Sequence, residues 1–285
     1  MTLTARAPGK VNLCLFLGPV RSDGRHELVT VFESVSLADL VTVEVADRDE
    51  VVCAGVDGVN IVTQAVDGLR RREWDGPSLR VLVGKRIPVA GGMGGGSADA
   101  AAVLRMAREL APVSDEDIAE LAASLGADVP SQLRPGLALG TGAGDVAQAL
   151  DPLAPHSFVI VPQPFGLSTA DVYREADRLG LPREASELAA RAGQIRAGAP
   201  MSHVNDLEPA ALSLRPEIGG ALDTVRGTGA DHAMVSGSGP TVFGLYLGND
   251  AAARASAAAL RLSDRYPGAT SAAPVREEFA APRGS

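Results

Sequence analysis

The chain is poor in lysine, in cysteine and in positive charge, and each shortage excludes a class of function. Lysine occurs only as Lys10 and Lys85, so the chain contains no Walker A phosphate loop, which ends in Gly-Lys-Ser/Thr. The formal net charge of −9 argues against a nucleic-acid partner, because such surfaces carry basic stripes. Cys14 and Cys53 lack the spacing of metal ligands, so we expect free, reduced thiols.

Signals for export and for membrane insertion are also missing. The N-terminus lacks a basic segment followed by an apolar one, and no apolar run reaches the length of a membrane span. We therefore expect a cytoplasmic protein without a membrane partner. A length of 285 residues and a hydrophobic content of 46% predict two domains. The Pro-containing segment 151–155 divides them into 1–152 and 153–285, and either a monomer or a homodimer fits.

Glycine, in contrast, is concentrated in one short stretch. Five of the six residues from Gly91 to Gly96 are glycine, too many for a stable helix or strand. A strand is predicted before them at 79–83, and a helix after them from Ser97, near its N-cap, to Leu110. This order aims backbone N–H groups and the positive end of a helix dipole at an anion, usually phosphate. A flexible linker is the alternative, which the apolar residues on both sides disfavour.

Four polar residues are candidates for contacts with a ligand in a cleft. Lys10 follows a turn at Pro8–Gly9 and begins an alternating strand, so Lys10 and Asn12 are expected to face the same side. Asp128 is flanked by Ala, Val and Pro, and a buried carboxylate there needs a cation, a helix terminus or a metal. His26 lies where a turn meets a strand, as a ligand contact or a structural residue.

Local patterns predict the other elements. Strands are expected at 3–18 with a break at Pro8–Gly9, and at 29–37, 40–45, 136–141 and 157–162. Asn60, Ser114 and Ser168 are predicted helix N-caps. A second glycine-serine turn is expected between strands within 234–246, a final helix at 250–262, and a loosely held C-terminal segment of ten residues. Together these elements predict an α+β fold.

Three separated motifs resemble the GHMP kinase superfamily. Pro8–Asn12 resembles its first motif, Pro88–Ala98 its ATP loop, and Val235–Thr241 its third motif. The motifs have the superfamily's order and span most of the chain. The resemblance implies a two-domain α+β fold, with an N-terminal domain like domain 2 of ribosomal protein S5 and a ferredoxin-like C-terminal domain.

Three shorter segments are similar to one family within it, the 4-diphosphocytidyl-2-C-methyl-D-erythritol kinases of the non-mevalonate isoprenoid pathway. These segments are Asp23–Leu28, Leu125–Pro130 and Asn205–Glu208. The family usually has Tyr where this chain has Arg25, although a guanidinium plane can also stack on a base. The resemblance implies transfer of the ATP γ-phosphoryl group to the 2-hydroxyl of a substrate that carries a cytidine diphosphate group, with Mg²⁺.

The resemblance also assigns roles to residues. Asp128 matches the catalytic aspartate, which acts as general base, and Lys10 matches the catalytic lysine. Asn12 would orient the acceptor, and Ser97 would lie near Mg²⁺. The cytidine group is assigned to Arg25, His26, Thr169 and Tyr173. The triphosphate is assigned to Pro88, Val89, Ala90, Gly91, Gly92, Met93, Gly94, Gly95, Gly96, Ser97 and Ala98.

Three other functions remain as alternatives. One is another kinase of the superfamily, which acts on homoserine or mevalonate. A second is a non-catalytic regulator that binds nucleotide, against which the presence of both Lys10 and Asp128 speaks. A third is a Rossmann oxidoreductase, which needs a second strand and an acidic residue after the glycine loop, where this sequence predicts helices.

Overall fold

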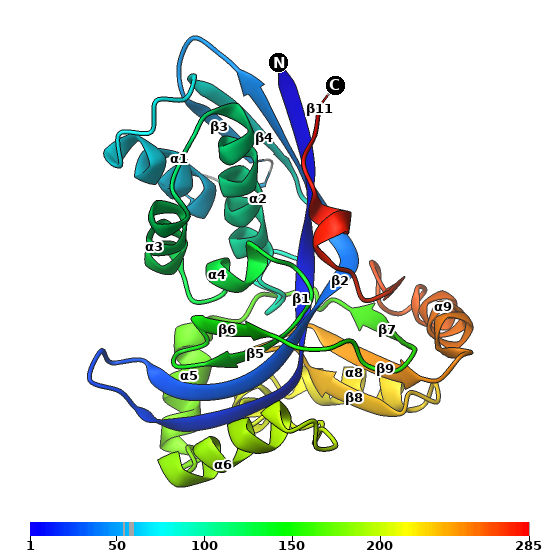
Figure 1. Ribbon diagram of the computed structural model, residues 1–285. Helices are drawn as coiled ribbons and strands as arrows, with labels where there is room; N and C mark the ends of the chain where they lie inside the picture. Colours follow the sequence, from blue (N-terminus) through cyan, green and yellow to red (C-terminus); the bar gives the residue numbers. More distant parts are fainter. Residues whose placement is uncertain (54, 57–59, 285) are drawn as a thin grey trace.

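The computed structural model describes residues 1–53, 55–56 and 60–284, and within them the chain forms two β-sheets (Figure 1). Apart from the parallel pair β3–β4, the strands of both sheets pair antiparallel. This topology excludes the parallel sheet of a Rossmann oxidoreductase. The larger sheet comprises β1 (Thr2–Val20), β2 (His26–Val45), β3 (Glu50–Cys53), β4 (Leu79–Gly84), β5 (Leu137–Thr141), β6 (Val146–Ala149) and β11 (Arg283–Gly284).

The long hairpin of β1 and β2 forms the spine of the molecule. On one edge of β2, β5 pairs with Thr30–Glu33 and β4 pairs with Leu40–Val45. The predicted breaks at Pro8–Gly9 and between 37 and 40 are wrong, since both strands are continuous. The pairing register instead shifts between Pro8 and Lys10, where residues 35–37 of β2 lie opposite Gly9 alone. This irregularity lies directly before Lys10.

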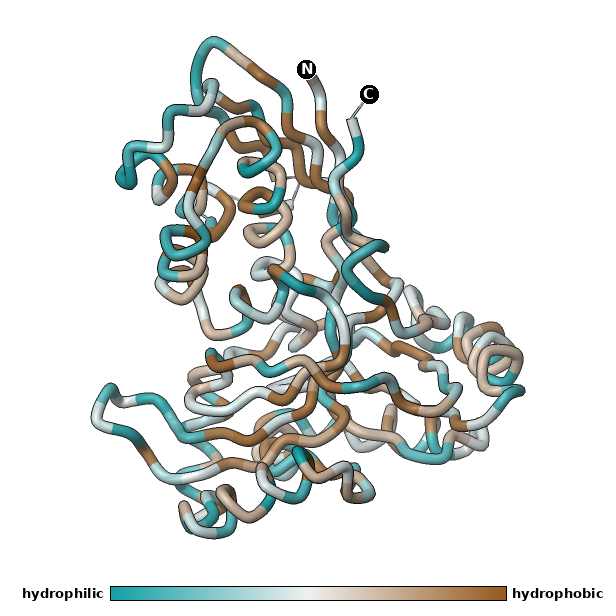
Figure 2. Tube along the Cα trace, in the orientation of Figure 1, coloured by the Kyte–Doolittle hydropathy of each residue, from teal (hydrophilic) through white to brown (hydrophobic). Residues whose placement is uncertain are grey.

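Helices cover one face of the upper half of the larger sheet (Figure 1). They are α1 (Ile61–Arg71), α2 (Gly95–Leu110), α3 (Asp115–Leu125) and the short α4 (Val129–Gln132). The alanines from 100 to 102 of α2 are completely buried, and such small side chains allow the helix to lie close to the strands. Hydrophobic residues of the strands accordingly face these helices, while the exposed loops are hydrophilic (Figure 2).

The smaller sheet runs in the order β10-β7-β9-β8, and α8 and α9 pack against it. Its strands are β7 (His156–Val161), β8 (His232–Val235), β9 (Val242–Leu247) and β10 (Thr270–Ala272). The helices that follow β7 in the sequence are α5 (Thr169–Arg178), α6 (Ala185–Arg196), α7 (Glu208–Leu214), α8 (Glu217–Arg226) and α9 (Ala251–Leu262). Leu15 and Leu17 of β1 pack against α5 and α7. The spine hairpin therefore contributes to the cores of both halves.

The C-terminal segment packs against the larger sheet, where the sequence predicted a loosely held tail. A 3-10 helix at Glu277–Ala280 precedes β11, which pairs with Leu3 and Thr4 at the start of β1. Ala280 is fully buried, and the Arg6 guanidinium lies 4.7 Å from the centre of the Phe279 ring. The two ends of the chain thus lie side by side (Figure 1). Of the described helices, none has both the length and the apolar character of a membrane span.

Candidate active site

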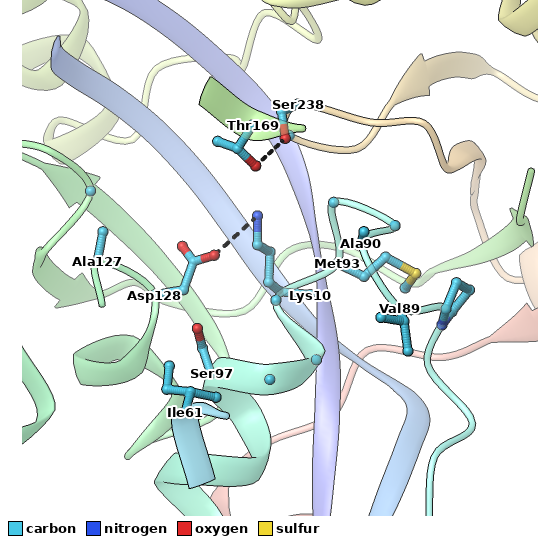
Figure 3. Close-up of a pocket in the computed structure, with 18 of the residues that line it drawn as sticks. Lys10, Ile61, Val89, Ala90, Met93, Ser97, Ala127, Asp128, Thr169 and Ser238 are labelled. Carbon is cyan, nitrogen blue, oxygen red and sulfur yellow. Dashed lines mark hydrogen bonds and ion pairs between the residues drawn. The ribbon is translucent and has the colours of Figure 1, made fainter. Parts of the chain in front are cut away.

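A cavity of about 500 Å³ lies where the glycine loop, β1 and the turn before α4 meet the smaller half of the molecule (Figure 3). Such a volume fits a small-molecule ligand. Among the predicted site residues, those that line it are Lys10, Asn12, Asp128, Thr169, Tyr173 and the loop from Pro88 to Ser97. The fold therefore brings together four segments that are far apart in the sequence. Ala98 is buried in the helix below the loop.

Lys10 is held at the bottom of the cavity by its neighbours on the spine hairpin. Its Nζ donates to Asn12 Oδ1 over 2.7 Å, and Asn12 Nδ2 donates to Thr30 Oγ1 over 2.8 Å. The Thr30 hydroxyl in turn donates to the Cys14 carbonyl over 2.6 Å. This chain of bonds fixes the amide of Asn12 with its oxygen toward Lys10, so the ammonium has a defined position.

Asp128 faces Lys10 from the other wall (Figure 3). Its Oδ2 lies 3.7 Å from Lys10 Nζ, and the Asp128 side chain is 34% exposed whereas that of Lys10 is 8% exposed. Asp128 is also the N-cap residue of α4, but its carboxylate makes no capping hydrogen bond. The carboxylate is therefore available to a ligand, and it lies beside the Lys10 ammonium.

The glycine loop is fixed between β1 and the second glycine-serine turn. The Lys10 N–H donates to the Met93 carbonyl over 2.9 Å, and the Ser236 hydroxyl donates to the Gly92 carbonyl over 3.1 Å. Gly92 has φ +76, and a Cβ there would lie 2.3 Å from the Ser236 carbonyl oxygen. Only glycine fits at this contact. The first and third sequence motifs therefore hold the second in place.

Helix α2 begins at Gly95, two residues before the predicted start, with Gly94 rather than Ser97 as its N-cap. Gly94 adopts the left-handed conformation, which is accessible to glycine. No side chain caps this helix end, and the N–H groups of the first turn have no intrahelical partners. Because Gly94 to Ser97 line the cavity, these N–H groups can bind an anion there.

Metal ligands provided by the protein are few around this cavity. No cluster of three His, Cys, Asp or Glu suited to a metal ion occurs among the described residues. Ser97 and Asp128 both line the cavity and offer one hydroxyl and one carboxylate. This donor set suits Mg²⁺, which retains several waters and binds through few protein ligands together with phosphates.

His26 and Tyr173 are brought together beside the cavity. Their ring centres are 5.2 Å apart at an angle of 42°, and a hydrogen bond of 2.8 Å joins His26 Nε2 to Asp177 Oδ1. Burial, with a smaller contribution from the Asp128 charge, raises the pKa of Tyr173. Thr169 Oγ1 lies 3.0 Å from Ser238 Oγ across the cavity mouth. Tyr173 and Thr169 thus contribute an aromatic ring and a hydroxyl to one wall of the cavity.

Arg25 lies at the tip of the spine hairpin, in an ion-pair cluster. Its guanidinium donates to Asp23 through Nε over 3.1 Å and through Nη2 over 3.0 Å, and to Asp145 over 3.1 Å. Among the described residues that line the cavity, neither Arg25 nor His26 is present. The side chain of His26 reaches the site through its contact with Tyr173, whereas that of Arg25 is held by two carboxylates.

A charge cluster at the other end of the cavity was not predicted from the sequence. Lys85 Nζ donates to Asp39 and, over 2.7 Å, to Asp99 Oδ2. Burial and the Asp39 charge raise the pKa of Asp99 to about 7, although the Lys85 charge opposes them. Burial lowers the pKa of Lys85, but the two carboxylates outweigh it and the net shift is upward. The three residues are far apart in the sequence, so no local pattern reveals them.

Family models and individual relatives agree on the classification of the chain. Residues 60–136 match the N-terminal domain of GHMP kinases, and residues 185–266 match the C-terminal domain. A 4-diphosphocytidyl-2-C-methyl-D-erythritol kinase from Corynebacterium efficiens is 43% identical over 268 residues, which cover 85% of this chain and 84% of the relative. A kinase of the same name from Streptomyces coelicolor is 41% identical, with 88% and 89% covered.

Solved structures give the same result. A crystal structure of 4-(cytidine 5'-diphospho)-2C-methyl-D-erythritol kinase superposes with a TM-score of 0.72 at 35% identity, covering 94% of this chain and 97% of that one. A homoserine kinase from Cytophaga hutchinsonii has a TM-score of 0.69 at 18% identity, with 99% and 96% covered, which shows the shared fold alone. The chain belongs to the GHMP kinases, in the family of 4-diphosphocytidyl-2-C-methyl-D-erythritol kinases.

Proposed function

We propose that this chain transfers the terminal phosphoryl group of ATP to the 2-hydroxyl of 4-diphosphocytidyl-2-C-methyl-D-erythritol, with Lys10 and Asp128 at the point of transfer. The observation that carries the proposal is the position of both side chains beside uncapped N–H groups of α2 in one cavity. Membership of the kinase family supplies the reaction and the use of ATP.

Asp128 is proposed as the general base. A tertiary alcohol is a weak nucleophile, and its proton must leave as the new P–O bond forms, so a carboxylate within reach assists the attack. The carboxylate is a third exposed and makes no capping bond, which leaves it free to accept this proton. The Lys10 ammonium, 3.7 Å from this carboxylate, is proposed to offset charge on the transferring phosphoryl group.

The glycine loop is proposed to hold the triphosphate. The N–H groups from Gly95 to Ser97 donate to the phosphate oxygens in this proposal, and the helix dipole strengthens the binding. Mg²⁺, when bound with the nucleotide, would neutralise phosphate charge, and Ser97 would supply one ligand. Asn12 is proposed to orient both the Lys10 ammonium, to which it is already bonded, and the acceptor.

The cytidine diphosphate group is proposed to bind at the wall formed by Thr169 and Tyr173. The Tyr173 ring offers a stacking surface for the base, and the neighbouring His26 ring supports it and offers a nitrogen to the cytosine edge. Arg25, at the tip of the spine hairpin, is also proposed to contact the base.

The experiment is a comparison of acceptors. The purified chain is incubated with Mg²⁺-ATP and either 4-diphosphocytidyl-2-C-methyl-D-erythritol, homoserine or mevalonate, and ADP is measured. We expect ADP with the cytidine compound alone, and NMR should place the new phosphate on its 2-hydroxyl. ADP formation with homoserine or mevalonate instead would replace the proposed substrate, and no ADP with any acceptor would contradict kinase activity.

A further inference from the structure

The distribution of lysine in this chain is uneven in a way that points to function. Only two of its 26 basic residues are lysines, and both line the same cavity. Lysine differs from arginine in offering a compact ammonium with three donors rather than a planar fork. Lys10 has a place in the proposed phosphoryl transfer. Lys85 lies in the same cavity without such a place, and its surroundings indicate what it does.

Lys85 connects three elements of the structure. Its ammonium bonds to Asp39 on β2 and to Asp99 on α2, and the side chains of the two aspartates are 0% and 2% exposed. Asp39 Oδ1 also accepts the backbone N–H groups of Arg86 and, over 2.8 Å, of Ile87. A buried lysine with two hydrogen-bonded carboxylates is held in a single position, unlike a solvated surface lysine.

These bonds join the two ends of the glycine loop. Lys85 lies three residues before Pro88, where the loop begins, and Asp99 lies in the second turn of the helix that follows it. The ammonium is also next to the loop, since a Cβ at Gly95 would lie 3.3 Å from Lys85 Nζ. One side chain therefore joins the two ends of the loop.

The charges explain why a cation is needed at this position. Asp99 lines the cavity one turn after the N–H groups proposed to bind the triphosphate, and Asp39 is bonded to the same lysine, Lys85. Without a cation between them, both carboxylates would repel phosphate at short range in a site of low dielectric constant. Lys85 bonds to Asp99 Oδ2, and Asp99 Oδ1 has no hydrogen-bond partner among the described residues. Lys85 is therefore the cation that partners this carboxylate.

We propose that Lys85 is a positioning residue for ATP: held between Asp39 and Asp99, it fixes the two ends of the glycine loop and shields the triphosphate from both carboxylates. The inference rests on the proposed binding of ATP in this cavity. It gives Lys85 a role in binding the nucleotide, and no role in binding the acceptor or in proton transfer.

The first test is Lys85→Met, which keeps the length of the side chain and removes the ammonium. Binding of a non-hydrolysable ATP analogue with Mg²⁺ is measured by calorimetry, together with kcat and both KM values. We expect the dissociation constant of the analogue and the KM for ATP to rise about tenfold or more, because small displacements of a binding loop are costly. The KM for the acceptor and kcat at saturating ATP should change less than about threefold.

A second variant separates the charge effect from the loss of the bridge. Asp99→Asn added to Lys85→Met removes one repelling carboxylate, and it should recover part of the lost ATP affinity. If Lys85→Met alone fails to fold, the double variant decides the question, since its analogue affinity should still be severalfold below that of the unchanged chain. An affinity equal to that of the unchanged chain would overturn the proposal.

Glu33→Gln is the matched control, because it breaks another buried pair, with His156, that does not line this cavity. It should lower stability and leave the affinity for the analogue unchanged. An equal loss of affinity in Glu33→Gln would mean that Lys85 affects ATP binding only through the stability of the fold, and it would contradict the inference. Failure of the unchanged chain to bind the analogue would instead refute the proposed function, and this inference with it.

Discussion

Lys10 Nζ and Asp128 Oδ2 lie 3.7 Å apart, close enough for an ion pair and slightly too far for a direct hydrogen bond. Lys10 comes from a bulged strand of the spine hairpin, and Asp128 comes from the turn before a four-residue helix. In the proposed mechanism, the carboxylate oxygen accepts a proton from an alcohol that approaches both side chains.

Replacing Asp128 tests the proposed general base. Asp128→Asn keeps the shape of the side chain but removes its basicity, so we expect kcat to fall at least about a hundredfold. The KM for ATP should change little, because the phosphate N–H groups are untouched. Steady-state kinetics measure both, and the melting temperature is the control, since the carboxylate makes no capping bond. Near-normal turnover in a folded variant would remove Asp128 from this role.

Replacing Gly92 tests the contact between the glycine loop and the third motif. Gly92→Ala places a methyl group 2.3 Å from the Ser236 carbonyl oxygen at a φ of +76, and we expect a loss of about 1–3 kcal/mol in the free energy of unfolding. Affinity for ATP should fall as well, because the loop must move.

Gly193→Ala in α6 is the matched control for this substitution. A Cβ at Gly193 meets nothing within 4 Å, so the change should leave ATP affinity unaltered and stabilise the helix slightly. Denaturation with urea and calorimetry with an ATP analogue give both quantities. Equal behaviour of the two variants would contradict the tight contact at Gly92.

Replacing Tyr173 tests the proposed cytidine wall. Tyr173→Ala removes the ring, and because base stacking contributes about 1–3 kcal/mol, the KM for the acceptor should rise about tenfold with the KM for ATP unchanged. Tyr173→Phe keeps the ring and should behave like the unchanged chain. Arg25→Ala, measured beside them, reports whether the guanidinium held by Asp23 and Asp145 also contributes to acceptor binding.

The buried pair of His156 and Glu33 predicts a pH dependence of stability. His156 Nδ1 donates to the Ala154 carbonyl over 2.7 Å, and Nε2 lies 2.7 Å from Glu33 Oε2, a geometry that suits the imidazolium form. Burial lowers the pKa of His156, but the carboxylate outweighs it and the net shift is upward. A raised pKa in the folded state stabilises the fold below about pH 6.5, and this contribution disappears as the pH rises through the folded value.

The measurement for this pair is the free energy of unfolding between pH 5 and pH 9. His156→Gln keeps two polar groups and removes the titration, so the difference in stability between the unchanged chain and this variant should be largest at the acidic end. A difference that grows with pH would contradict the imidazolium form.

Local signals in the sequence predicted helix starts well. Asn60, Ser114 and Ser168 are N-caps whose side chains accept N–H groups of the first turn, as expected. The predicted start of α2 at Ser97 was two residues late, because the left-handed conformation of Gly94 starts the helix earlier. A cap read from residue type alone cannot detect a backbone conformation that only glycine adopts easily.

Long-range features could not be predicted from local patterns. The continuous β1 and β2 shift their pairing register beside Pro8, which the sequence around the proline does not reveal. Lys10 and Asp128 were expected near each other from the family resemblance, and the structure places them 3.7 Å apart. The bridge of Lys85 joins residues from three distant segments, and its charges pair only after the chain has folded.

The pairing of β11 with the start of β1 has a consequence for how the protein is made. Leu3 and Thr4 are synthesised about 280 residues before their partners Arg283 and Gly284. The outer edge of the strand that carries Lys10 therefore stays open until synthesis has passed these partners, and the larger sheet is completed late.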